Sequence, residues 1–185
     1  MTWKPGDRPH PSASMIRVDQ AGEFGAIRIY AGQLAIMGQR SPMARKISAM
    51  ALQEEKHRAF FDRMIVARGV RPTLFQPFWD VAGFALGAVT AAIGPEAAMA
   101  CTAAVETEID KHYEEQLVAL GDSDPELSDA IREFQAEELE HRDTALANGA
   151  EDDFRAWSER VDRSAAAFAG RGMFVIDGSQ CHKSP

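Results

Sequence analysis

Residues 53–58 read Gln53-Glu54-Glu55-Lys56-His57-Arg58, and residues 137–142 repeat the pattern as Glu137-Glu138-Leu139-Glu140-His141-Arg142. Both stretches contain Glu-x-x-His followed directly by arginine. Residues three apart lie on one face of a helix, so each motif directs a carboxylate and an imidazole toward one place. A single motif of this kind is weak, because short motifs recur by chance. Two copies in one chain predict a metal pair held between helices.

Each motif has a matching glutamate upstream, on an otherwise apolar helical face. Glu23 precedes Glu54 by 31 residues, and Glu106 precedes Glu138 by 32 residues. Neighbouring positions match as well, since each upstream glutamate is followed at identical spacing by tyrosine, glutamine and leucine: Tyr30, Gln33 and Leu34 in the first half, and Tyr113, Gln116 and Leu117 in the second. The repeat predicts an internal duplication in which two helix pairs form a four-helix bundle.

The helical period of apolar residues, with proline and glycine at its interruptions, predicts helices over about 15–39, 42–68 and 95–120, and a fourth that ends near 147. Ser14 is the expected cap of the first helix. Pro42 and Pro95 suit first helical positions, and Gly69 suits a helix end. The expected fold class is therefore all-α: a ferritin-like four-helix bundle made of two duplicated helix pairs, with an extra apolar helix at the crossover.

The repeated residues form a set of six predicted metal ligands: Glu23, Glu54, His57, Glu106, Glu138 and His141. One glutamate from each of two helices, plus one Glu-x-x-His from each of the other two, is the pattern of di-iron and di-manganese carboxylate bundles. Carboxylates are hard donors that suit Fe(II) or Mn(II), whereas zinc prefers fewer ligands, with sulfur or several histidines. Four core-facing glutamates are costly to bury without cations, so we expect a less stable metal-free form.

Other polar residues near these helix faces are candidates for supporting roles. Tyr30 and Tyr113 lie two turns beyond the upstream glutamates and are expected to hydrogen-bond to ligands or to fill the core. His112 suits a core, an interface or the active site. Asp19 and Asp143 are candidates for orienting His57 or His141, although Asp19 also suits a helix start. We expect four further glutamates to be solvent-exposed: Glu55, Glu108, Glu137 and Glu140.

The least polar part of the chain connects the two halves. Val81 to Gly94 is uncharged, but at about 14 residues it is shorter than the roughly 20 that a membrane-spanning helix needs. Two interpretations of residues 75–94 stay open from the residues alone. The segment is either a buried core helix or a helix lying flat in a membrane interface, with Phe75, Phe78, Trp79 and Phe84 as anchors.

Composition limits the remaining classes. The formal net charge of −8 argues against nucleic acid as a partner, because phosphates demand a basic surface. Cys101 and Cys181 are too few for a zinc ribbon, and the N-terminal residues lack the apolar core of a secretory signal, so a reducing cytoplasmic setting is expected. The predicted organisation is an irregular arm over 1–13, the bundle over 14–148 and a C-terminal helix and tail over 149–185.

Four stretches together resemble one family, the Coq7 demethoxyubiquinone hydroxylases: VDQAGEFGAIRIYAGQ (18–33), QEEKH (53–57), ACTAAVETEIDKHYEEQL (100–117) and EELEHRD (137–143). The resemblance covers about residues 15–147. It implies that the six predicted ligands bind two iron ions, and that the His112-Tyr113 pair lies near the quinone or on the electron route. Tyr30, the counterpart of Tyr113 in the duplication, is a candidate catalytic residue with them. It also favours the interfacial interpretation of residues 75–94, because the substrate of the family carries a polyprenyl tail.

The implied activity is that of a 3-demethoxyubiquinol 3-hydroxylase-type monooxygenase, which hydroxylates the benzoquinone ring of a ubiquinone precursor with O₂. Since the chain has no Gly-x-Gly-x-x-Gly fingerprint, its electrons are expected from outside, either from NADH, the favoured donor, reacting through the quinone or from a reductase. Implied partners are the polyprenyl quinone, O₂, a membrane lipid surface and either a second copy of the chain or another protein of ubiquinone biosynthesis. The implied location is peripheral, on the cytoplasmic side of a bacterial inner membrane.

Three alternatives remain beside this function. A ferritin-like ferroxidase or iron-storage protein shares the six-ligand pattern. A peroxide-reducing protein of the rubrerythrin type would carry paired Cys-x-x-Cys motifs, which the chain lacks. A non-enzymatic helical partner protein leaves the four core-facing glutamates unexplained.

Overall fold

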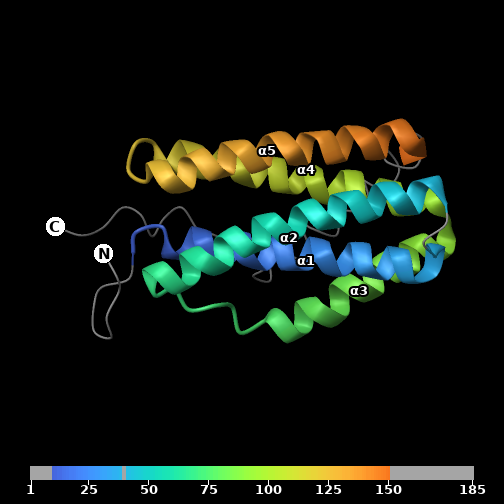
Figure 1. The fold of residues 1–185 in the computed structure, drawn as a ribbon, viewed down its shortest axis with the longest axis horizontal. Coiled ribbons are helices and arrows are strands. Elements are labelled where there is room, and N and C mark those ends of the chain that lie inside the picture. The colour runs from blue at the N-terminus through green and yellow to red at the C-terminus, as the bar shows by residue number, and fades with distance from the viewer. Residues whose placement is uncertain (1–9, 39–40, 151–185) are drawn as a thin grey trace.

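The computed structural model describes residues 10–38 and 41–150 and contains no strand within them. Five α-helices are present: α1 (Ala13–Met37), α2 (Pro42–Arg68), α3 (Gln76–Ile93), α4 (Pro95–Leu120) and α5 (Pro125–Ala145), followed by a short π-helical turn, η1 (Leu146–Ala150). α1 and α2 form one hairpin, α4 and α5 form the second, and α3 lies along the outer side of α1 (Figure 1). The all-α prediction of two helix pairs with an apolar crossover helix is confirmed. The helix expected within residues 151–169, the tail and Cys181 lie outside the described residues.

Most helix ends form where the sequence signals them. Ser41 caps α2 by accepting a hydrogen bond from the Ala44 amide at 3.0 Å, and Pro42 and Pro95 occupy first-turn positions. Gly69 ends α2 in the left-handed conformation with φ of 61°. The expected cap at Ser14 is wrong, because α1 begins earlier, at Ala13, and Ser14 lies within the helix.

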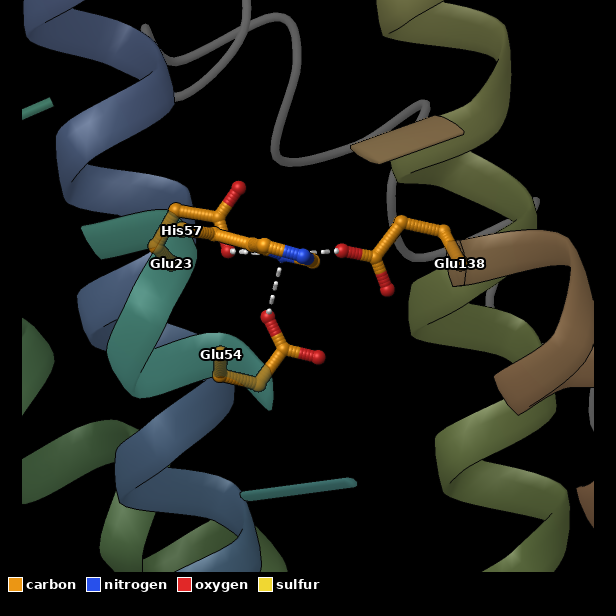
Figure 2. A group of neighbouring side chains, drawn as sticks. All are labelled: Glu23, Glu54, His57 and Glu138. Carbon is orange, nitrogen blue, oxygen red and sulfur yellow. Dashed lines mark ion pairs between the residues drawn. The ribbon is translucent and has the colours of Figure 1, made fainter. Parts of the chain in front are cut away.

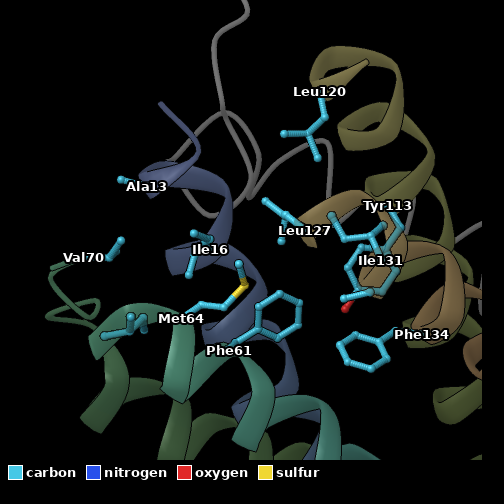
Figure 3. Close-up of a cluster of buried hydrophobic side chains, with 12 residues drawn as sticks. Ala13, Ile16, Phe61, Met64, Val70, Tyr113, Leu120, Leu127, Ile131 and Phe134 are labelled. Atoms are coloured by element: carbon cyan, nitrogen blue, oxygen red, sulfur yellow. The ribbon is translucent and has the colours of Figure 1, made fainter. Parts of the chain in front are cut away.

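Two apolar clusters fill the bundle, one toward each end. Figure 3 shows the first, where side chains from all four bundle helices converge, including Ile16, Phe61, Tyr113 and Ile131. The second is built from smaller residues around Tyr30, Ile47, Met50 and Met99, with several alanines. Each cluster holds one tyrosine of the duplicated pair. The apolar clusters therefore keep water from both ends of the space between them.

A buried ion pair joins the two hairpins at one end of the bundle. Arg68, the last residue of α2, bonds Asp124 through Nη1 and through Nη2, the latter 3.0 Å from Oδ1. Asp124 in turn caps α5 by accepting from the Leu127 amide, and it also accepts from the Ser12 hydroxyl at 2.7 Å. The Arg68 guanidinium outweighs the effect of burial and lowers the pKa of Asp124 below its usual range. One carboxylate thereby fixes the ends of α1, α2 and α5.

The crossover helix α3 is half-buried rather than a core helix. Its buried face carries Gly83, Gly87, Thr90 and Ala91, and the two glycines pack against α1. Its opposite face exposes a run of large apolar side chains at helical spacing: Phe78, Val81, Leu86, Val89 and Ile93. The interpretation of residues 75–94 as a wholly buried helix is therefore wrong. No helix in the described part of the chain has both the length and the apolar character needed to cross a bilayer.

Close packing of α3 on α1 predicts that Gly87→Ala destabilises the protein by about 1–3 kcal/mol, because a Cβ there would collide with the Ile29 carbonyl oxygen. Gly22→Ala in α1 is the matched control, since its Cβ would meet nothing within 4 Å. That substitution should instead stabilise by about 0.5–1 kcal/mol through helix propensity. Urea unfolding followed by circular dichroism measures both, and equal effects of the two substitutions would contradict the packing.

Candidate metal centre

The six predicted ligands come from all four helices of the bundle and meet at its middle. α1 supplies Glu23, α4 supplies Glu106, and the other two helices supply the Glu-x-x-His pairs. All six residues are at most 3% exposed. Figure 2 shows one side of the group, where Glu23, Glu54 and His57 face Glu138 across the gap between the hairpins.

The six residues divide into two overlapping groups. Glu23, Glu54, His57 and Glu138 bring one ligand atom each to within 4.8 Å of one another. Glu54, Glu106, Glu138 and His141 do the same. Because Glu54 and Glu138 belong to both groups, the geometry suits two neighbouring cations with two shared carboxylates between them.

Both histidines point Nδ1 into this space. His57 Nδ1 lies 3.1 Å from Glu138 Oε1 and 3.5 Å from the nearer oxygens of Glu23 and Glu54. His141 Nδ1 lies 3.1 Å from Glu54 Oε1 and 3.0 Å from Glu138 Oε2. The same ring nitrogen of each histidine therefore faces the shared carboxylates.

The inward atoms are the ones that lack conventional hydrogen-bond partners. Six buried atoms of this cluster form no hydrogen bond within the described structure: Glu23 Oε2, Glu54 Oε1 and Oε2, His57 Nδ1, Glu106 Oε2 and Glu138 Oε1. A buried polar atom left without a partner costs about 1–3 kcal/mol, and more where it is charged. Hard oxygen donors with one imidazole at each end are a donor set for divalent first-row cations, so the residues present fit a metal pair.

The tyrosines of the duplication bond across the bundle, each to the glutamate of the opposite half. Tyr30 donates its hydroxyl hydrogen to Glu106 Oε1, and Tyr113 donates to Glu23 Oε1. Each bond holds one carboxylate oxygen and leaves the other, Oε2, directed at the cluster. Of the two sequence-based interpretations of these tyrosines, the hydrogen-bonding one describes the geometry.

The outer nitrogens of the histidines are held by residues that the sequence analysis missed. Glu137 Oε2 lies 2.8 Å from His57 Nε2, and Gln53 Oε1 lies 2.8 Å from His141 Nε2. The expected orienting role of Asp19 and Asp143 is wrong, because Asp19 faces His112 and Asp143 pairs with Arg142. Glu137, expected at the surface, is half-buried, with a side chain that is 33% exposed.

A signal for this pair was present in the sequence. Gln53 and Glu137 immediately precede the glutamates of the two motifs, so the duplication itself places them at equivalent positions. Glu55, Glu108 and Glu140 are exposed as expected.

His112 lies beside the cluster but belongs to neither ligand group. Its Nε2 is 3.1 Å from Asp19 Oδ1, and the amide of Gln116 donates to the same oxygen at 2.6 Å. Burial raises the pKa of Asp19 to about 6, against the opposing effect of His112. His112 is 17% exposed, so this small polar group connects the interior near Glu23 with the surface.

Crowding of carboxylates governs the protonation of the site. Burial and the charge of Glu138 raise the pKa of Glu54 well above its usual range, and burial with the charges of Glu138 and Glu54 does the same for Glu106. Burial alone would lower the pKa of His57, but the neighbouring carboxylates of Glu138, Glu23 and Glu54 reverse that effect and raise it. The metal-free site therefore holds protons at neutral pH, and cation binding must release them.

Paired helix hairpins around four glutamates and two histidines define the class of ferritin-like carboxylate bundles. Within that class, the family described as "Ubiquinone biosynthesis protein COQ7" matches residues 10–167, and the chain belongs to this family. The resemblance inferred from the sequence is thus confirmed.

Individual relatives are similar over most of the chain. A 3-demethoxyubiquinol 3-hydroxylase of Rhodospirillum rubrum is 54% identical over 149 residues, which cover 79% of this chain and 70% of the relative. The mitochondrial NADPH-dependent 3-demethoxyubiquinone 3-hydroxylase of Mus musculus is 51% identical over 141 residues, or 74% and 64% of the two chains. The mitochondrial 5-demethoxyubiquinone hydroxylase of Saccharomyces cerevisiae is 43% identical over 148 residues, covering 71% and 64%. The matched part thus spans about two thirds of these relatives.

Metal removal should destabilise the protein, because cations neutralise the crowded carboxylates only in the folded state. At free metal 100-fold above the dissociation constant, one bound ion should contribute about 2.7 kcal/mol to the free energy of unfolding. Glu106→Gln keeps the hydrogen bond from Tyr30 but removes one buried charge. The metal-free variant should have a higher melting temperature than the metal-free wild type. Its melting temperature should rise much less when metal is added.

Thermal melts with and without Fe(II) or Mn(II) measure these effects, with exposed Glu115→Gln on the same helix as the control. A metal-free wild type that melts as high as the loaded form would contradict the assignment.

Proposed function

We propose that this protein is a di-iron monooxygenase that hydroxylates the benzoquinone ring of a demethoxyubiquinone or demethoxyubiquinol precursor in ubiquinone biosynthesis. The observation that carries the proposal is the pair of ligand groups sharing Glu54 and Glu138, found in a member of the COQ7 family. The names of the relatives describe the same hydroxylation.

In this proposal the two groups of the centre take defined roles. Glu23 and His57 would hold one iron ion, Glu106 and His141 would hold the other, and Glu54 and Glu138, which belong to both groups, would serve both ions. Bound iron would supply the reduction of O₂ that ring hydroxylation needs. The protein itself fixes the donor atoms, keeps water out with the apolar clusters at both ends, and holds Glu23 and Glu106 in place through the crossed tyrosine bonds.

Three further residues are proposed to act on the quinone or on the route of electrons: Tyr30, Tyr113 and His112. The tyrosines touch the ligands Glu106 and Glu23, and His112 links the cluster region to the surface through Asp19. The electrons come from an external reduced nicotinamide nucleotide, and we propose NADH as the donor. Several relatives are named as NADPH-dependent enzymes, so the choice of nucleotide belongs to the test.

We further propose that α3 lies in a membrane interface and gives a polyprenyl quinone access from the lipid phase. Its exposed face is apolar over its full length, from Phe78 (51% exposed) to Ile93 (74% exposed), and Leu74 and Phe75 continue this face before the helix. A helix with one apolar face and aromatic residues at one end is suited to binding in the plane of an interface. The corresponding location is peripheral, on the cytoplasmic side of a bacterial inner membrane.

The activity test uses the iron-loaded protein in detergent with a demethoxy quinone of short prenyl tail, O₂ and either NADH or NADPH. Mass spectrometry should detect a quinone product that has gained one oxygen atom from isotope-labelled O₂. Glu106→Gln should reduce product to background because a ligand carboxylate is lost, whereas exposed Glu115→Gln should retain wild-type turnover. Iron oxidation and mineral formation without hydroxylated quinone would instead favour a ferroxidase or iron-storage function.

Membrane binding is tested by sedimentation with phospholipid vesicles. Phe78→Gln and Val81→Gln should each weaken binding by about 10- to 100-fold, because each removes roughly 1.5–3 kcal/mol of apolar burial. Val118→Gln is the matched control, since Val118 is 81% exposed but lies on α4, away from the α3 face. An equal loss of vesicle binding in the α3 and α4 variants would contradict a membrane interface formed by α3.

A further inference from the structure

The duplicated halves hold their histidines with equivalent geometry but unequal charge. Gln53 and Glu137 occupy matching positions, each directly before the glutamate of its motif. Each accepts at 2.8 Å from the outer nitrogen of the histidine in the opposite hairpin: Glu137 from His57, and Gln53 from His141. One acceptor is a carboxylate and the other is a neutral amide.

The orientation of these groups follows from a third contact. Gln53 Nε2 points at Glu137 Oε2 at 3.4 Å, which places its carbonyl oxygen Oε1 toward His141. Both histidines therefore face hydrogen-bond acceptors with Nε2, so Nε2 carries the hydrogen in each ring. When a cation displaces the protons that the metal-free site holds, the lone pair of Nδ1 would be directed at that cation in both copies.

We propose that Glu137 is a positioning residue that makes the two metal ions inequivalent by strengthening His57 as a ligand. A hydrogen bond to a carboxylate is stronger than one to an amide and draws the Nε2 hydrogen further from the ring, which increases the basicity of Nδ1. The ion held by Glu23 and His57 binds more tightly than the ion held by Glu106 and His141, and its higher oxidation state is favoured. The inference rests on the metal pair of the proposed function, but not on its substrate.

The Glu137 carboxylate lies at the edge of the site rather than in its interior. Its side chain is 33% exposed, so the carboxylate stays partly hydrated while Oε2 accepts from His57. Gln53, the neutral partner of His141, donates a hydrogen bond to the same oxygen of Glu137. Hydrogen bonds thus link four side chains of α2 and α5 in the order His57, Glu137, Gln53 and His141. The one carboxylate in this chain is bonded to His57.

Stepwise binding of Co(II) to the metal-free protein, followed by visible absorption, tests the proposal without quinone or turnover. The wild type should bind two ions in two steps, with the tighter step stronger by about 10-fold or more. Glu137→Gln is isosteric and equalises the two acceptors, so the tighter step should weaken about 10–100-fold and approach the other. The double variant Gln53→Glu with Glu137→Gln moves the carboxylate to His141, and two separate steps should return.

Glu133→Gln, an exposed change on the same helix, is the control for loss of a negative charge on α5. Mössbauer spectra of the iron-loaded proteins give an independent readout: two distinct ferric environments in the wild type and the double variant, converging in Glu137→Gln. Helical circular dichroism verifies that each variant is folded.

Three results would overturn the inference. They are equal affinities in the wild type, equal weakening of both steps by Glu137→Gln, and failure of the double variant to restore two steps. The proposed function fails in a different way, since a wild type that binds no Co(II) or iron pair would refute the metal centre itself. Two equal ions in an active hydroxylase would refute only the role of Glu137.

Discussion

The structure depends on the mutual repulsion of four buried carboxylates and on what relieves it. Glu54 and Glu138 face one another from opposite hairpins and share both histidines as neighbours. Protons relieve the crowding in the metal-free protein, and two bound cations would relieve it more completely, because each would attract several oxygens at once. Stability and metal binding are therefore one property of this bundle. A substitution that removes one of these carboxylates should therefore stabilise the metal-free protein and weaken its binding of metal.

The bonds of the site also explain how the hairpins stay together. Tyr30 reaches from the first hairpin to Glu106, and Tyr113 reaches back from the second to Glu23. At one end the Arg68–Asp124 pair joins α2 to the start of α5. The apolar clusters contribute burial on both sides of the centre, but directional contacts fix the register of one hairpin against the other. Several independent contacts thus fix the geometry of the centre, as is required of a site that must hold its donor atoms in place.

The sequence was sufficient to predict the six clustered residues, because spacing along a helix decides which side chains share a face. The helix ends at Pro42, Gly69 and Pro95 were predictable for a similar reason, since proline and glycine act through the backbone. Partners across the bundle were harder to predict. Asp19 pairs with His112 and Glu137 with His57 because the helices cross at one particular register, which tertiary packing sets. The half-buried state of α3 depends on how closely Gly83 and Gly87 allow it to approach α1, and a local apolar pattern does not carry that information.

The departures from the internal repeat are as informative as the repeat. Gln33 reaches Thr102 at 3.3 Å, and its counterpart Gln116 reaches Asp19 at 2.6 Å, so a neutral hydroxyl in one half corresponds to a buried carboxylate in the other. Ile29 likewise corresponds to His112, and Gln53 to Glu137. The added charges, Asp19 and Glu137, both lie on the side of Glu23 and His57, whereas α3 packs closely on α1 at Ile29 and Gly32, on either side of Tyr30. In a duplicated bundle that only stored metal, nothing would require the added carboxylates to lie on one side of the centre and the apolar helix α3 on the other. A centre that reacts with both O₂ and a lipid-soluble ring would benefit from having one polar side and one apolar side.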